Sequence, residues 1–134
     1  MSTPITTTTT PTFSNYINGE WIESGHTFEK RNPANTEDLV ALFSKGSAQD
    51  IAQAADAAAA AFPAWSSLNA PARGSILFKT AELLDRRFDS ITAEMTREEG
   101  KTLPEAKGEV RRAINIFRYF AGEGARLPGL LVPS

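Results

Sequence analysis

The sequence lacks cysteine, and its 134 residues include a single histidine, His26. The absence of cysteine excludes disulfide bonds, thiolate-bound zinc, iron–sulfur clusters and a thiolate nucleophile within this chain. One histidine cannot form a polyhistidine metal site. Ser24 lies close to His26, but no acidic residue is placed to orient the imidazole. We therefore predict no metal site, and we interpret His26 as an exposed loop histidine.

The sequence also lacks a basic excess and a long apolar run. Its net charge is −2 and its pI is about 5.4, which argues against the basic surface that nonspecific nucleic-acid binding requires. The longest apolar run, Ala57–Trp65, is too short to span a bilayer. Residues 1–14 contain no lysine or arginine and do not resemble a secretory signal. We expect a cytoplasmic protein that binds neither nucleic acid nor membrane.

Residues 1–46 divide into a tail and an arm. Residues 1–14 are rich in threonine and include Pro4 and Pro11, so we predict a disordered tail. From residue 15 to 46 the pattern predicts a β-hairpin arm and an extended segment. Asn18-Gly19 separates two short runs that carry apolar residues, which is typical of a type I′ hairpin turn. Residues 27–29 and 39–43 look extended, with a loop at 32–35. A hairpin alone is marginally stable, and no later segment clearly supplies another sheet.

Residues 47–127 predict about four helices. The first begins at the cap Ser47 and ends at Pro63. Its apolar side, rich in alanine, predicts close packing against another element. The second begins near Asn69, with Pro71 in its first turn, and a third covers residues 91–99. The predicted buried residues of the first helix are Ile51, Ala54, Ala55, Ala58 and Phe62, and those of the second are Ile76, Leu77, Thr80, Leu83 and Leu84.

The fourth helix is expected to begin at the cap Thr102, with Glu105 three residues later, and to reach about Leu127. Gly100 fits the end of the preceding helix. Gly108 predicts a close approach by another backbone, because glycine otherwise weakens a helix. Residues 128–134 then predict the start of an interrupted continuation. The apolar side of this helix consists of Val110, Ala113, Ile114, Phe117, Phe120 and Ala121.

Few motifs in the sequence point to chemistry. Gly122 and Gly124 match two glycines of a dinucleotide fingerprint, but they follow a helix and Leu127 replaces the third glycine. We therefore predict no cofactor-binding residue. Glu98 and Glu99 are adjacent in a helix, so they do not face each other as an acid–base pair. The pair at 111–112 is typical of a surface ion-pair network. Composition, periodicity and spacing alone do not specify a function.

A set of segments in a fixed order resembles the start of NAD(P)-dependent aldehyde dehydrogenases. They are 16–21 (YINGEW), 31–35 (RNPAN), 61–65 (AFPAW), 98–101 (EEGK), 105–110 (EAKGEV) and 117–122 (FRYFAG). The resemblance covers residues 15–134. Residues 121–127 (AGEGARL) and 132–134 (VPS) look most like members acting on ketoglutaric or related dicarboxylic semialdehydes.

This resemblance implies an α/β fold, of which the chain would be a mostly helical N-terminal fragment. In the family a cysteine thiolate attacks the aldehyde, hydride passes to NAD or NADP, and a glutamate activates water. The resemblance places those residues downstream of Ser134. We expect the complete protein to be a homo-oligomeric oxidoreductase acting on a small aldehyde, and this chain alone to be inactive and to bind no cofactor. The alternative is a non-catalytic interaction module that docks onto intact dehydrogenase subunits.

The resemblance also suggests one set of site residues. The helix that carries Glu109, Arg112 and Ile116 resembles the helix bordering the mouth of the substrate tunnel in the family. Arg112 would there meet an anionic group, which suits a semialdehyde that carries a carboxylate. The alternative for Arg112 is an ordinary surface arginine.

Overall fold

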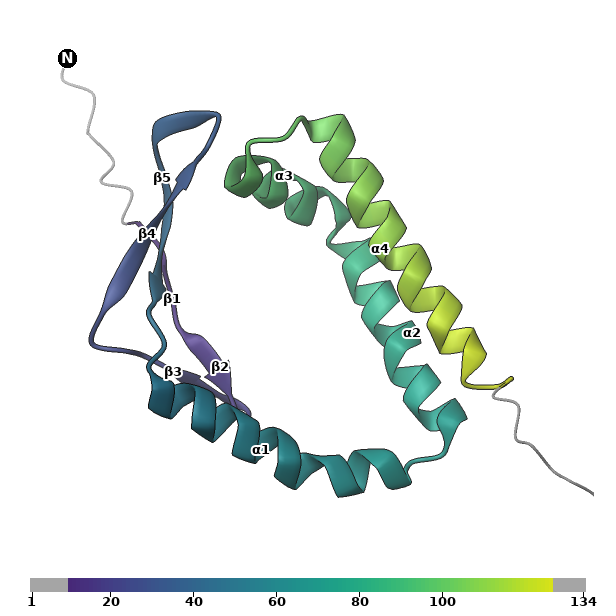
Figure 1. Cartoon of the computed structure of the whole chain (residues 1–134). Helices are drawn as coiled ribbons and strands as arrows, with labels where there is room; N and C mark the ends of the chain where they lie inside the picture. Colours follow the sequence, from purple (N-terminus) through teal and green to yellow (C-terminus); the bar gives the residue numbers. More distant parts are fainter. Residues whose placement is uncertain (1–9, 127–134) are drawn as a thin grey trace, which may run out of the picture. The chain divides into compact units, whose positions relative to one another are not determined.

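The computed structural model describes residues 10–126, in which the predicted order of a strand arm followed by four helices is confirmed (Figure 1). The chain divides into two compact units. The strand unit runs to Ala58 and includes Arg97–Gly100, and the helical unit comprises Ala59–Thr96 and the residues from Lys101 onward. The elements are β1 (Thr12–Phe13), β2 (Asn15–Ile17), β3 (Glu20–Ile22), β4 (Thr27–Asn32), β5 (Asn35–Ser44), α1 (Ala48–Ser67), α2 (Ala70–Arg86), α3 (Phe88–Glu99) and α4 (Leu103–Glu123).

The first hairpin, β2–β3, forms at the predicted turn. Asn18 and Gly19 have φ angles of 52° and 85°, the positive values that a type I′ turn requires. The antiparallel register pairs Tyr16 with Trp21, and their ring centroids lie 4.9 Å apart. This cross-strand aromatic pair adds stability to a hairpin of only three residues a side.

The predicted tail of residues 1–14 is wrong at its end, because Thr12–Phe13 form β1. This strand runs parallel to β5 and pairs with Leu42–Phe43. The rings of Phe13 and Phe43 stack with centroids 5.3 Å apart, so an aromatic contact accompanies the backbone pairing of the two strands. The partner lies 30 residues further along the chain, so local composition could not reveal it. The predicted disorder of residues 1–9 concerns residues outside those described.

The strand unit also contains a second hairpin that the sequence pattern did not predict. β4 and β5 pair antiparallel from Thr27 with Ser44 to Asn32 with Asn35, and the expected loop at 32–35 is their turn. The order of the resulting sheet is β1-β5-β4. The β2–β3 hairpin remains a separate two-stranded sheet, and no other strand of residues 10–126 pairs with it. The extended piece predicted at 27–29 is the first half of β4, and the polar residues that follow it extend the strand to Asn32 through their pairing with β5.

Helix α1 begins as predicted and ends later than predicted. Ser47 Oγ accepts a hydrogen bond from the Asp50 amide at 3.1 Å, while the Asp50 carboxylate accepts from the Ser47 amide at 2.6 Å. Pro63 does not end the helix, which continues to Ser67. The ring removes one amide donor, but the surrounding alanines favour the helical backbone strongly enough to carry it one turn further. No α1 residue is buried, so its predicted packing face has no cover within residues 10–126.

Helices α2 and α4 pack side by side and hold the core of the helical unit (Figure 1). Their caps are as predicted: Asn69 Oδ1 accepts from the Ala72 amide at 2.9 Å, and Thr102 and Glu105 form a capping box. The buried cluster is Ala81, Val110 and Ile114, with Leu84, Phe88, Ile91, Met95 and Phe117 packed against it. α4 ends at Glu123 rather than at Leu127.

Close backbone approach occurs at other glycines than the predicted Gly108. A Cβ atom at Gly108 would meet nothing within 4 Å, whereas one at Gly74 would lie 2.5 Å from the carbonyl oxygen of Ala121. A Cβ at Gly124 would lie 2.6 Å from the Ala70 oxygen. The two helices therefore approach most closely where α2 begins and α4 ends. The reason is orientation, because Gly108 faces away from α2.

The predicted buried side of α2 is correct only in part. Leu77, Thr80 and Leu84 are half-buried, and Ala81 is fully buried. Ile76 and Leu83 are exposed. The apolar side of α2 is wider than the part of it that α4 covers.

α3 begins at Phe88, three residues earlier than predicted, and Gly100 ends it with a φ of 74°. Arg97, near its end, belongs to the strand unit and binds Asp38 of β5 through two nitrogens at 2.9 and 2.6 Å. The same guanidinium donates to the Leu39 carbonyl at 3.0 Å. Within residues 10–126 no helix is long and apolar enough to cross a membrane.

Candidate functional site

Helix α4 brings the three predicted tunnel residues to one side of the helical unit. Glu109, Arg112 and Ile116 follow one another at helical spacing, and all three side chains are exposed. Val110 and Ile114 lie on the other side of the helix and are buried in its contact with α2. The site is therefore a fixed, solvent-facing row of one acidic, one basic and one apolar side chain on a rigid element.

Lys101, in the turn between α3 and α4, contacts the acidic member of this row. Its Nζ lies 2.7 Å from Glu109 Oε2, and its side chain is only 18% exposed, against 56% for Glu109. The contact of Lys101 with Glu109 was not predicted from the sequence. The signal for it is the spacing: Lys101 lies just before the capping box, and Glu109 lies one turn after Glu105 on the same side of α4.

The two adjacent arginines of α4 have different surroundings. Arg111 lies 2.7 Å from Asp85 of α2 and has its guanidinium 4.5 Å from the centroid of the Phe88 ring. Arg118 binds the other oxygen of Asp85 at 2.8 Å. The guanidiniums of Arg118 and Arg111 hold the pKa of the Asp85 carboxyl below its ordinary value. Arg112 makes no ion pair or side-chain hydrogen bond with any residue between 10 and 126. The predicted ion-pair network therefore includes Arg111 and leaves Arg112 available.

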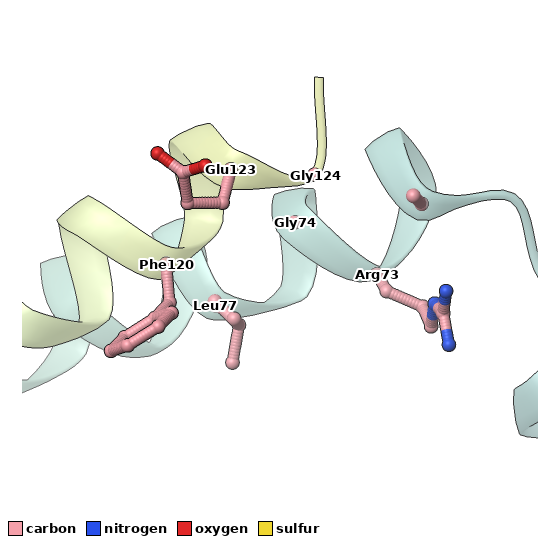
Figure 2. Close-up of a pocket in the computed structure, with 7 residues that line it drawn as sticks. Arg73, Gly74, Leu77, Phe120, Glu123 and Gly124 are labelled. Atoms are coloured by element: carbon pink, nitrogen blue, oxygen red, sulfur yellow. The ribbon is translucent and has the colours of Figure 1, made fainter. Parts of the chain in front are cut away.

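A small pocket lies between the start of α2 and the end of α4 (Figure 2). Its volume is about 270 Å³, and Leu77 and Phe120 supply apolar surface. The charged ends of Arg73 and Glu123 point away from each other in Figure 2, so they do not converge on one point. The volume lies below the usual range for ligand sites, about 300–1,000 Å³. The lining residues are Ala70, Arg73, Gly74, Leu77, Phe120, Glu123 and Gly124.

The two glycines at the end of α4 do not fit a dinucleotide fingerprint. Gly122 and Gly124 lie at the end of α4 instead of opening a helix after a strand. The Cβ position of Gly124 faces the Ala70 carbonyl oxygen at 2.6 Å, so this glycine allows the close contact of α4 with α2. That no cofactor binds this chain stays a prediction.

The remaining sequence candidates do not form a site. The Ser24 hydroxyl donates to the backbone carbonyl of His26 and not to its imidazole. Among residues 10–126, no three histidine, aspartate or glutamate side chains are grouped so that they could hold a metal ion.

Comparison with known proteins places this arrangement in a family. The sequence profile described as "Aldehyde dehydrogenase family" matches residues 21–134. The chain belongs to the aldehyde dehydrogenase family. Its fold is accordingly a piece of the aldehyde dehydrogenase fold, made of a strand arm and four helices.

Two curated members of this family are semialdehyde dehydrogenases. The chain is 46% identical over 125 residues to the alpha-ketoglutaric semialdehyde dehydrogenase of Bacillus subtilis (strain 168), an alignment covering 92% of this chain and 26% of that protein. It is 48% identical over 117 residues to the alpha-ketoglutarate semialdehyde dehydrogenase of Haloferax volcanii, covering 86% of this chain and 24% of that protein. The chain thus spans about a quarter of the length of these relatives.

A solved aldehyde dehydrogenase-type structure matches the fold closely. The 1-pyrroline-5-carboxylate dehydrogenase from Thermus with bound NAD superposes with a TM-score of 0.88 and 28% identity, covering 93% of this chain and 25% of that one. NAD is therefore bound by a dehydrogenase with the same local architecture.

Proposed function

We propose that these residues form the N-terminal part of an NAD(P)-dependent aldehyde dehydrogenase that oxidises a semialdehyde carrying a carboxylate to the corresponding acid. The observation that carries the substrate class is Arg112, an exposed guanidinium without a partner among residues 10–126, on the predicted tunnel-bordering side of α4. The names of the two semialdehyde dehydrogenases, at 46% and 48% identity, support the same class. A guanidinium binds a carboxylate strongly and in a defined orientation.

In that proposal this chain contributes residues that border the path of the substrate, and it contributes none of the groups that react. The family's reaction needs a cysteine thiolate, and the chain contains no cysteine. The cofactor would supply hydride acceptance in the complete protein, while Glu109, Arg112 and Ile116 would border the path of the aldehyde. We expect the isolated chain to form no NADH or NADPH from any aldehyde. We also propose cytoplasmic location and homo-oligomeric assembly for the complete protein.

A chimera tests the substrate class. Residues of this chain replace the matched segment of the Bacillus subtilis relative, and the enzyme is assayed with 2-oxoglutarate semialdehyde and with an uncharged aldehyde of similar length. Arg112→Gln should raise KM for the charged substrate about tenfold and leave that for the uncharged aldehyde near the parent value, because a charge-assisted bond is worth about 1.5 kcal/mol. Arg111→Gln is the matched control. Equal effects of Arg112→Gln on both aldehydes would contradict the proposal.

The second candidate function is the interaction module that docks onto intact dehydrogenase subunits. It is favoured by the large apolar side chains that the helical unit leaves exposed. Size-exclusion chromatography of the chain with the intact Bacillus subtilis enzyme tests this function. The chain must co-elute with the enzyme, and separate elution of the two would contradict docking. These side chains include Ile76, Phe78, Leu83, Ile116, Tyr119 and Phe120.

A further inference from the structure

Glu109 and Arg112 stand three residues apart on α4, at a spacing where opposite charges normally pair. Such a pair would neutralise the guanidinium and occupy the donors that a substrate carboxylate needs. Instead, Glu109 is bound by Lys101, and no residue from 10 to 126 pairs with Arg112.

The position of Lys101 explains why Glu109 binds Lys101 in preference to Arg112. Lys101 is mostly covered, so its charge lies where attraction to a carboxylate is less screened than between two exposed side chains. The turn that carries it is fixed on one side by Gly100, with its φ of 74°, and on the other by the capping box of Thr102. Glu105 lies on the same side: its pKa is lowered first by hydrogen bonds from Thr102 and additionally by the charge of Lys101.

We propose that Lys101 is a positioning residue, which holds the Glu109 carboxylate and thereby keeps Arg112 open to the carboxylate of the substrate. The inference rests on the proposed role of Arg112 and adds a specificity determinant outside the row of tunnel residues. Lys101 itself does not touch the substrate. Its loss frees Glu109 to pair with Arg112, so the anion must compete with an internal carboxylate.

The test uses the 134-residue chain and glutarate, a dicarboxylate without an aldehyde. Nitrogen-labelled protein reports the Arg112 Nε–H signal by NMR, first without ligand and then during titration. In Lys101→Met the ligand-free Arg112 signal should shift as Glu109 binds it, and glutarate affinity should fall about twofold, the effect of one helical ion pair. Lys101→Arg should retain the parent affinity, and Lys101→Met/Glu109→Gln should restore it.

Controls separate the inference from simpler explanations. Lys107→Met removes one positive charge from α4 itself. Lys107 lies two residues from Glu109, and side chains at that spacing in a helix do not face each other, so the Arg112 signal should stay unchanged. A merely structural need for Lys101 would not be rescued by Glu109→Gln. If Lys101→Met matches the parent in both readouts while Arg112→Gln abolishes the glutarate response, the role of Lys101 is overturned and that of Arg112 stands. If Arg112→Gln leaves glutarate binding intact, the proposed carboxylate recognition itself falls.

Discussion

On one side of α4, Arg111 and Arg118 both bind Asp85 of α2, whereas Arg112, adjacent to Arg111 in sequence, faces solvent. Consecutive helical residues point about 100° apart, so neighbours of identical type have different surroundings. The packed side gives its arginines a fixed acidic partner. On the open side, Arg112 has no charged partner among residues 10–126, and the Glu109 carboxylate three residues before it is bound by Lys101. The ion-pair partner of a charged residue in a helix therefore cannot be predicted until the side of the helix on which that residue lies is known.

The same division separates the apolar residues of α4. Ile114 is fully buried against α2, while Ile116 is 46% exposed on the open side. Stability should therefore depend on one side of the helix and recognition on the other. Paired substitutions can test that separation directly.

The largest expected effect is the loss of core packing at Ile114. Ile114→Ala should lower the free energy of unfolding by about 3 kcal/mol, because it removes buried methylene groups and leaves a cavity. Ile116→Ala should cost less than about 1 kcal/mol, since half of that side chain already contacts water. Urea unfolding followed by circular dichroism measures both. Equal losses at the two positions would show that α4 does not have a packed and an open side.

The next effect contrasts two glycines of the helical unit. Gly74→Ala should lower the free energy of unfolding by about 1–3 kcal/mol, because its Cβ would lie 2.5 Å from the Ala121 carbonyl in the close contact of α2 with α4. Gly108→Ala should raise it by about 0.5–1 kcal/mol, since open space surrounds that position and alanine favours the helix. Thermal melts of both variants check the opposite signs. Stabilisation by Gly74→Ala would mean that the helices do not approach at this point.

These contrasts also show what the sequence could and could not reveal. The turn at Asn18-Gly19 and the caps Asn69 and Thr102 were predictable, because each depends on residues within four positions. The pairing of β1 with β5 was not, since its partners lie 30 residues apart and β1 has only two residues. Pro63 was misinterpreted because a proline rule ignores how strongly the alanines around it favour a helix.

The candidate site was predictable to a similar degree. Helical spacing places Glu109, Arg112 and Ile116 in one row, and the family resemblance suggested that row. The spacing makes the Lys101–Glu109 contact possible, but the contact also depends on the direction that the turn at Gly100 gives to the Lys101 side chain, which the spacing does not encode. Likewise, Gly74 and Gly108 are indistinguishable in sequence until the contact between α2 and α4 is known.

The smallest effect concerns pH and the packed side alone. Arg118 and Arg111 lower the pKa of Asp85 below its ordinary value of 3.8, so the folded state favours the ionised carboxyl. A carboxyl with a lowered pKa contributes stability above its unfolded-state pKa and loses that contribution as pH falls through the folded-state pKa. Asp85→Asn should therefore lower the urea midpoint at neutral pH and leave it close to that of the parent once the pH has fallen below the folded-state pKa of Asp85. Arg112→Gln should keep the pH profile of the parent, because Arg112 has no acidic partner among residues 10–126. An altered acid profile in Arg112→Gln would show that the open side takes part in the charge network of α2.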